Sequence, residues 1–540
     1  MGPLIAVPGK DMSLKEILLL NKALTRSSAY KQMEMEHKIN SLCANYSTPL
    51  SLAEERVLGL SISELVTGCR SGALQPASIL EPYLKKALLC HQATNCLSDL
   101  MFENALDDPL FADCTPRYKG GAANQPGLLG IPVSIKDTID IVGHDSTIGF
   151  SRNVRQPAKS SSAMVKLLQD AGAILHVKTT VPTGLISLET SSDMFGRTSN
   201  PHNGKHSAGA STGGGAALVA GGGSKIEIGT DIAGSVRIPA HFCGIWSIKG
   251  SSGRFPSWGN RSPMPGLHSI PLVVSPLASN LDDLQEFCKQ VIHAKPWVYD
   301  HTCIPLPWRS LDLHEDGRKL KWGVIWDDGV LRDKSPDSRY LLTFKGLQRY
   351  YPSDARLRAR FTSGSRRSQA AGTRIAYWMT SHSFPSCPPD ISEGLNIGYQ
   401  LLFSDGGEGS NPKCSSTRRG GHSSCKRGIR PIKPSTARQE IVISVVLHLD
   451  YAAGVMPVTY VNKTLDGLPK DFAHSEEYQR LSSVGKGAYL AYDADKMHGL
   501  PVGIQVAGLR LEEEKVLGGM RVIETALRDL GIVFVNKVTL

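Results

Sequence analysis

The residues with the clearest chemical potential lie in two stretches rich in glycine and serine. The first covers 207–215 and reads SAGASTGGG, and the second covers 225–239 and reads KIEIGTDIAGSVRIP. Small side chains let the backbone N–H groups of such segments approach a ligand closely. Either stretch could therefore bind a phosphate group or stabilise an oxyanion that develops during a reaction.

Three interpretations of these stretches compete. A phosphate loop needs Gly-Lys-Ser/Thr after four spacer residues, and the sequence contains no such motif. The segment 209–213, GASTG, matches the G-x-S-x-G nucleophile motif, but the polar stretch 198–206 stands where that motif requires a hydrophobic strand. A Gly/Ser linker fits the composition but does not explain the run TDIAGS at 230–235. His202 and His206 lie in the polar stretch without a placed acid, which disfavours a serine–histidine pair.

Positioning these residues requires an alternation of strands and helices. Lys136 follows the apolar segment 130–135, which is typical of a buried strand. Ser61 and Glu64 have capping-box spacing at the start of a helix that reaches about residue 69. The same periodicity predicts helices at 76–90, 162–170 and 512–530 and strands at 173–177 and 500–506. We therefore predict an α/β fold.

The segment 338–440 breaks this rhythm with clustered Arg, Ser, Gly and Pro. Within it, residues 354–438 contain 14 Lys+Arg and 5 Asp+Glu, which leaves 46 against 45 in the rest of the chain, so the net charge of +10 belongs mostly to one segment. A structureless stretch of this length is unusual inside a compact domain. Two explanations stay open, a mistranslated part of the gene model and a real basic, low-complexity insertion.

The bulk composition is that of a globular protein without a cofactor signature. Eleven cysteines occur without a C-x-x-C pair or histidines at zinc spacing, so we expect reduced thiols, no metal and no cofactor. The first residues lack the pattern of a secretory signal, and the apolar run 441–449 is far shorter than the roughly 20 residues of a bilayer span. These features predict a cytoplasmic protein without a membrane span.

Several of these segments together resemble the amidase signature family, and within it the fungal acetamidase-like branch. The matching text lies at 130–137, 209–218, 229–240, 499–508 and 511–516, with weaker similarity through 63–106. About three quarters of the chain is covered. The resemblance implies a central twisted mixed β-sheet covered by helices on both faces, with an N-terminal helical extension at 1–50 and the amidase domain at 51–540.

The resemblance also implies a Ser-Ser-Lys triad that hydrolyses an amide through an acyl-enzyme. Lys136 corresponds to the base, Ser211 to a bridging serine on a cis peptide, and Ser235 to the nucleophile. The implied oxyanion hole consists of backbone amides, those of Ile232, Ala233, Gly234 and Ser235. Four further matching positions are expected to support the site: Thr212, Thr230, Asp231 and Arg237.

Chemistry sets a condition on Lys136. A charged lysine cannot accept the proton of a serine hydroxyl. Its pKa must therefore fall from about 10.4 to roughly 7 or 8, which burial can achieve. We predict that Lys136 is desolvated and has no carboxylate, such as that of Asp137, in direct contact.

The sequence departs from the family pattern at four places. Ala210 precedes the bridging serine where the pattern has glycine, and Thr212 replaces a second serine but keeps a hydroxyl. Gly215 stands where glutamate is common. Ala233 replaces a glycine of the oxyanion loop, which is harmless at negative φ and disruptive at positive φ.

The leading hypothesis is a stand-alone amidase acting on a small or medium carboxamide, without nucleic-acid binding. A homodimer is also considered. Two alternatives remain, a glutamine-dependent amidotransferase subunit, which the acetamidase-like C-terminal text disfavours, and a catalytically impaired amidase-like protein.

Overall fold

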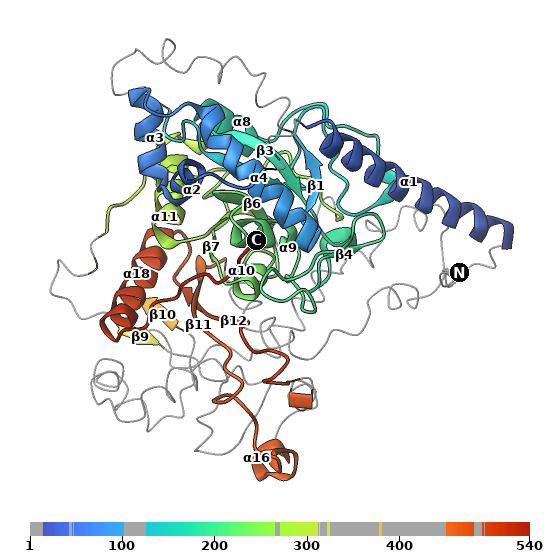
Figure 1. Cartoon of the computed structure of the whole chain (residues 1–540). Helices are drawn as coiled ribbons and strands as arrows, with labels where there is room; N and C mark the ends of the chain where they lie inside the picture. Colours follow the sequence, from blue (N-terminus) through green and yellow to red (C-terminus); the bar gives the residue numbers. More distant parts are fainter. Residues whose placement is uncertain are drawn as a thin grey trace.

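A large mixed β-sheet forms the centre of the chain in a computed structural model (Figure 1). The structure describes residues 14–42, 46, 48–101, 126–264, 271–311, 313, 321–323, 377–380, 450–479, 486, 489–490 and 492–540. Apart from the four residues 377–380, the atypical segment 338–440 lies outside the described residues.

Ten of the described strands share one sheet in the order β1-β3-β2-β6-β8-β7-β11-β12-β10-β9. Their bounds are β1 Leu97–Leu100, β2 Pro132–Lys136, β3 Ile174–Thr179, β6 Ile226–Asp231, β7 Trp246–Lys249, β8 Val273–Ala278, β9 Lys321–Gly323, β10 Tyr377–Thr380, β11 Ala453–Tyr460 and β12 Pro501–Ala507. The pairs β3/β2, β2/β6 and β12/β10 are parallel, and the other neighbours are antiparallel. A separate hairpin pairs β4, Ser191–Ser192, with β5, Gly196–Arg197.

Helices cover both faces of the sheet, as expected for the predicted fold class. The described helices are α1 Leu14–Asn40, α2 Leu52–Gly59, α3 Ile62–Ser71, α4 Pro76–Thr94, α8 Ala163–Asp170, α9 Gly213–Ala220, α10 Arg237–Cys243, α11 Leu281–His293, α16 Glu476–Gln479 and α18 Glu513–Asp529. Buried side chains of α3, α8, α11 and α18 pack with Val133 and Ile135 of β2 in one core cluster. Buried side chains of α9, α10 and one side of α4 form a second core cluster. Since neighbouring strand residues point to opposite faces, Ser134 and Lys136 point toward α9.

The helices and strands predicted from the sequence are present, with ends shifted by one to four residues. Ser61 and Glu64 form the expected capping box, and Gly72 ends α3 in a left-handed conformation at φ 76°. The helix predicted at 76–90 continues to Thr94. In the added turn Thr94 is buried and its hydroxyl donates to the carbonyl of Cys90 at 2.6 Å, and Asn95 ends the helix in a left-handed conformation at φ 57°.

The helix α1 lies outside the sheet and is tied to it by charges. Lys38 pairs with the carboxylate of Asp99 in β1, and its ammonium also donates to the carbonyl of Leu100 at 3.2 Å. The other oxygen of Asp99 lies 2.8 Å from Nδ1 of His144. These partners hold the pKa of Asp99 below its usual range despite burial. The domain boundary at residue 50 stays a prediction.

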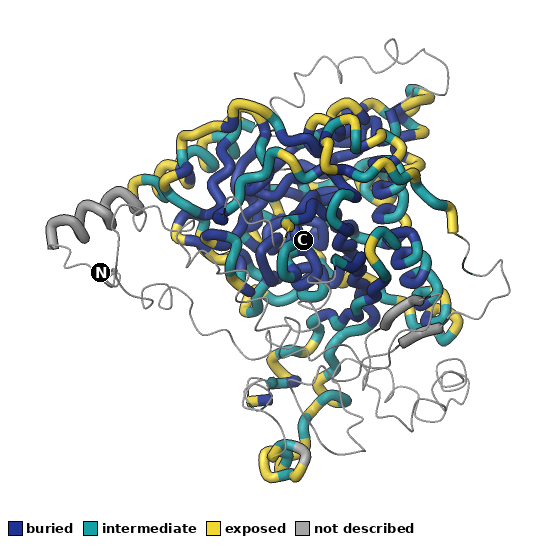
Figure 2. Tube along the Cα trace, turned by 180° about the vertical axis from the view of Figure 1, so that it is seen from behind, coloured by how far each residue is buried: buried dark blue, intermediate teal, exposed yellow. Residues whose placement is uncertain are grey.

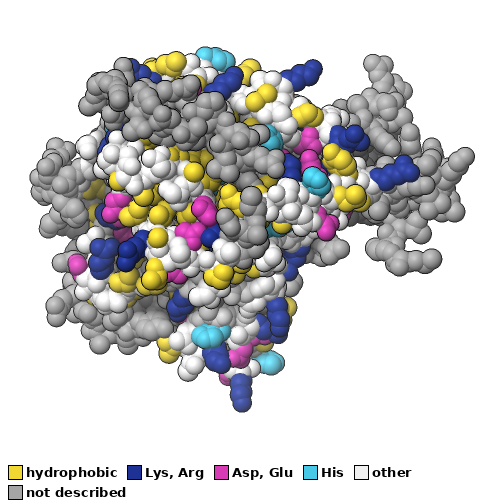
Figure 3. Space-filling model, turned by 45° about the horizontal axis from the view of Figure 1, so that its top comes forward, with side chains coloured by type: hydrophobic (Ala, Val, Ile, Leu, Met, Phe, Trp, Pro, Cys, Tyr) yellow, Lys and Arg dark blue, Asp and Glu magenta, His cyan; other side chains and the backbone are white. Residues whose placement is uncertain are grey.

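The described surface carries mixed charge. On the face drawn in Figure 3, basic and acidic side chains are interspersed. Figure 2 shows that buried residues are concentrated in the sheet and its helices, while the described parts of 461–498 around α16 reach away from this body. Within the described residues, no helix has the length and apolar character needed to cross a membrane.

We expect Asp99→Asn to loosen α1. The substitution removes the charge that holds Lys38 and should lower the free energy of unfolding by roughly 1–3 kcal/mol. Limited proteolysis should then cut within 14–40 faster than in the wild type. The matched control is Glu36→Gln, an exposed residue of the same helix. Equal cleavage rates for the two variants would show that the Asp99 contacts do not anchor the helix.

Candidate active site

Lys136 ends the central strand β2, and its amine is fully enclosed. Its side chain is 0% exposed, and Nζ is hydrogen-bonded to Ser211 Oγ at 2.8 Å and to Thr230 Oγ1 at 2.9 Å. The carbonyl of Thr230 accepts a third hydrogen bond at 3.1 Å. Lys136 takes part in none of the ion pairs found among the described residues. The neighbouring carboxylate of Asp137 instead accepts hydrogen bonds from Thr147 and Ile148.

This environment favours the neutral amine. Burial lowers the pKa of Lys136 to about 7, although the negative charges of Asp231, Glu227 and Asp137 act in the opposite direction. Hydroxyl and carbonyl partners do not supply the full negative charge that would hold the proton. The prediction that Lys136 is desolvated and lacks a carboxylate in direct contact is confirmed.

Ser211 reaches Lys136 from the loop before α9. The peptide bond between Ala210 and Ser211 is cis, as the resemblance implied. The Ser211 side chain is 1% exposed, and the carbonyl of the preceding Gly209 accepts a hydrogen bond from Thr190 Oγ1 at 2.8 Å. Gly209 has φ 80°, and a Cβ there would meet the backbone of Pro239 at 2.9 Å. The Gly/Ser stretch is therefore a packed turn against α10, which rules out a flexible linker.

Ser235 lies on the adjacent loop between β6 and α10. Its carbonyl accepts a hydrogen bond from the backbone N–H of Thr212 at 3.0 Å, which joins this loop to the one that holds Ser211. Ser235 is half-buried, whereas Thr212 is fully buried. The hydroxyl of Thr212 has no hydrogen-bond partner within the described residues.

Asp231 and Arg237 brace the loop that connects them. The guanidinium donates to both carboxylate oxygens, through Nε at 3.1 Å and through a terminal nitrogen at 3.0 Å. Asp231 also accepts the backbone N–H groups of Gly234 at 2.7 Å and Val236 at 3.2 Å. Although burial opposes ionisation, Arg237 lowers the pKa of Asp231 to about 2. Such a paired and fully hydrogen-bonded carboxylate fixes the loop rigidly.

The predicted oxyanion donors differ in their hydrogen bonds. The N–H of Gly234 donates to the Asp231 carboxylate at 2.7 Å. The described hydrogen bonds include none from the amides of Ile232, Ala233 and Ser235. Ala233 does not have a positive φ, whereas Gly234 has φ 101°. Alanine at position 233 therefore does not strain the backbone.

Sequence reasoning missed a buried carboxyl below Lys136. Glu227 of β6 is 0% exposed, and its carboxyl oxygens accept hydrogen bonds from Ser134 and from Thr179. Gln505 of β12 was missed as well, and its side-chain oxygen accepts a hydrogen bond from Arg237 at 3.0 Å. The available signal for Glu227 was a charged residue between two isoleucines in an apolar strand. Gln505 gave no such signal, because its partner lies far away in the sequence.

The described hydrogen bonds of the His202 and His206 rings go to backbone carbonyls and not to Ser211 or Ser235. Nε2 of His202 lies 2.9 Å from the carbonyl of Cys243, and Nε2 of His206 lies 2.9 Å from that of Lys496. No cluster of three His, Cys, Asp or Glu side chains that could hold a metal occurs among the described residues.

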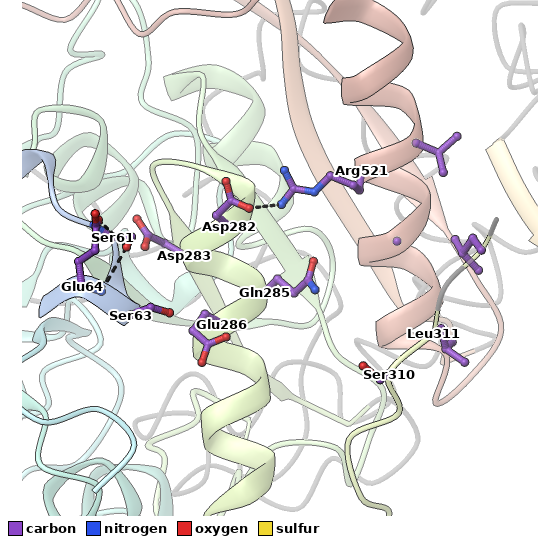
Figure 4. A pocket seen from close by; sticks show the side chains of 13 residues that line it. Ser61, Ser63, Glu64, Asp282, Asp283, Gln285, Glu286, Ser310, Leu311 and Arg521 are labelled. Carbon is purple, nitrogen blue, oxygen red and sulfur yellow. Dashed lines mark hydrogen bonds and ion pairs between the residues drawn. The ribbon is translucent and has the colours of Figure 1, made fainter. Parts of the chain in front are cut away.

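A polar cavity of about 860 Å³ lies elsewhere, between α3, α11 and α18 (Figure 4). Glu64, Asp282 and Glu286 line it, and Arg521 pairs with Asp282 there. None of the triad residues lines this cavity.

Comparison with known proteins adds sequence relatives. The family model described as Amidase matches residues 78–347. An acetamidase of Aspergillus oryzae is 30% identical over 547 aligned residues, which cover 94% of this chain and 97% of the relative. An acetamidase of Emericella nidulans is 29% identical, with coverage of 87% and 89%.

Solved structures show the same fold. A fatty acid amide hydrolase superposes with a TM-score of 0.74 at 22% identity, covering 95% of this chain and 96% of that one. At this level of identity the likeness concerns the fold, and it agrees with the mixed sheet and the helices on both of its faces.

We expect Lys136→Met to stabilise the protein near neutral pH. The pKa of Lys136 is about 7 in the folded chain against 10.5 as its ordinary value, so between these pH values the unfolded chain binds a proton that the folded chain lacks. The free energy of unfolding of the wild type should therefore rise with pH across this window. Relative to Lys136→Met, the rise should reach on the order of 4 kcal/mol. Urea unfolding of both proteins at pH 7 and pH 10 measures the change.

The control is Lys85→Met. Lys85 is also buried but pairs with Glu54 at 2.6 Å, so its loss should destabilise the protein. A constant difference between wild type and Lys136→Met across the two pH values would contradict a neutral Lys136.

Proposed function

The chain belongs to the amidase family and is a hydrolase of C–N bonds in amides, and we propose that it works through a triad of Lys136, Ser211 and Ser235 with an acyl-enzyme intermediate. The observation that carries this proposal is the buried amine of Lys136, hydrogen-bonded to Ser211 at 2.8 Å and without a carboxylate partner among the described residues. A lysine in that state is a base near neutral pH.

The proposed reaction begins with two linked proton transfers. Neutral Lys136 takes the proton of Ser211, and Ser211 takes the proton of Ser235 as the Ser235 oxygen attacks the amide carbonyl. The carbonyl oxygen becomes an oxyanion, which the free amides of Ile232, Ala233 and Ser235 stabilise by hydrogen bonds. Thr230 supports the step by keeping two acceptor groups on the amine.

Collapse of the tetrahedral intermediate breaks the C–N bond. The leaving nitrogen receives the stored proton by the reverse path from Lys136 through Ser211, and the acyl group stays on Ser235. Water then gives a proton to the same relay and attacks the ester, which releases the acid and restores the serine. Rigid donors matter here, because an oxyanion hole acts through dipoles that do not need to reorganise.

The relatives support the proposed substrate class. The acetamidases of Aspergillus oryzae and Emericella nidulans match nearly the whole chain, which supports a small or medium carboxamide as substrate. Release of ammonia or an amine from such a substrate requires no cofactor in the steps above. Cytoplasmic location and a homodimer stay predictions.

We expect a fluorophosphonate probe to label the wild type and not Ser235→Ala. Hydrolysis of acetamide and benzamide should fall by about 1000-fold or more in Ser235→Ala and Lys136→Ala, because each removes a part of one relay. Mass spectrometry of the labelled peptide identifies the modified serine, and ammonia release measures turnover.

The matched control is Ser279→Ala. Ser279 is half-buried just after β8, at the end of the β6/β8 pair opposite to Asp231, so labelling and turnover should persist. Labelling that survives in Ser235→Ala would refute the assignment of the nucleophile. Folded wild-type protein that neither reacts with the probe nor releases ammonia would instead indicate a catalytically impaired amidase-like protein.

A further inference from the structure

Glu227 is a buried carboxyl group that the proposed reaction does not use. It is the second residue of β6, and neither of its two hydrogen-bond donors carries a charge. Isolated burial of an ionisable group is costly. A carboxyl group at this position in a sheet centre therefore calls for a functional explanation.

The donors of Glu227 flank Lys136 on two strands. Ser134 precedes Lys136 by two residues and points to the same face of β2. Thr179 is the cross-strand partner of Lys136 in the β2/β3 register, and its hydroxyl donates to Oε1 of Glu227 at 2.7 Å. The carboxyl group thus sits among strands β2, β3 and β6 beside the base.

The absence of a side chain at Gly215 makes room for this carboxyl group. A Cβ at Gly215 would lie 2.1 Å from Cδ of Glu227 and 2.3 Å from its Oε1. Gly215 is the position where the family pattern commonly has glutamate. In this chain the space beside this helix residue holds the carboxyl group of Glu227 from the sheet.

We propose that Glu227 is a positioning residue whose buried negative charge controls how readily Lys136 gives up its proton. This inference rests on the proposed role of Lys136 as the base. The carboxylate makes no direct contact with the amine and acts across the sheet by charge, while Ser134 and Thr179 hold it in place.

The surrounding charges define what Glu227 adds. Toward Lys136, β6 also presents Asp231, which Arg237 of α10 neutralises in part. Asp137 follows Lys136 directly after the end of β2; burial raises the pKa of Asp137, and Lys178 of β3 acts in the opposite direction. The described residues of α9 contain no titratable side chain. Burial raises the pKa of Glu227 to about 7, against the effect of its two hydroxyl donors and of Lys136. Glu227 and Lys136 therefore titrate in the same range as a coupled pair.

The test is the pH profile of kcat/KM for Glu227→Gln, which keeps the shape of the side chain and removes its charge. Loss of the negative charge should let Lys136 become neutral at lower pH. The acid limb of the profile should move down by roughly 0.5 to 1 pH unit and take the shape of a single titration. A merely structural role would lower activity at every pH and leave the position of the limb unchanged.

A second variant protects the test against a folding failure. Thr179→Val removes one donor that stabilises the charged carboxylate, so Glu227 should stay protonated to higher pH and the limb should move in the same direction by a smaller amount. The matched control is Glu513→Gln, another glutamate with 0% exposure, at the start of α18 and paired with Arg254, for which no shift is expected.

Two outcomes separate this proposal from the proposed function. If Lys136→Ala and Ser235→Ala are inactive while Glu227→Gln and Thr179→Val keep the wild-type limb, or move it upward, the inference about Glu227 is overturned and the triad stands. If Lys136→Ala retains the wild-type rate and profile, the triad itself fails, and with it the reason for coupling.

Discussion

The structure depends on one constraint, an amine held without charge in the centre of a β-sheet. Lys136 ends a strand that has neighbours on both sides, so water cannot reach it through the sheet. Three segments meet at its amine: β2 carries Lys136, β6 supplies Thr230, and the loop before α9 supplies Ser211. Fixing three segments around one neutral base explains why the Gly/Ser stretches are packed so tightly against their neighbours.

Other buried cations show that burial alone does not make a base. Lys178 and Lys249 are as enclosed as Lys136. Lys178 donates to the carbonyl of Asp145 and to Ser146 Oγ, and Lys249 donates to two backbone carbonyls. Arg237 is held by both oxygens of Asp231. Lys136 differs because its serine partner, Ser211, lies on a loop that a backbone hydrogen bond joins to the loop of Ser235. Arg237, paired with Asp231, fixes the loop. Lys136, without a carboxylate partner among the described residues, can act as the base.

The sequence predicted much of the site because its residues lie in contiguous segments. The strand before Lys136, the turn at Ser211 and the segment around Ser235 each gave a local signal. Glu227 and Gln505 were missed because their partners lie far away in the sequence, on strands β2 and β3 for Glu227 and on helix α10 for Gln505. Side-chain direction across a sheet follows from register that a single sequence does not specify. The hydrogen bond from the N–H of Gly234 to the Asp231 carboxylate likewise depends on the three-dimensional turn and not on a local sequence signal.

The departures from the family pattern therefore do not point to a damaged enzyme. Ala233 would strain the loop only with a left-handed backbone, and the neighbouring Gly234 takes that conformation. Gly215 loses an acid, but Glu227 fills the space that its side chain would need. At these two positions the site therefore has neither a strained backbone nor an empty buried space.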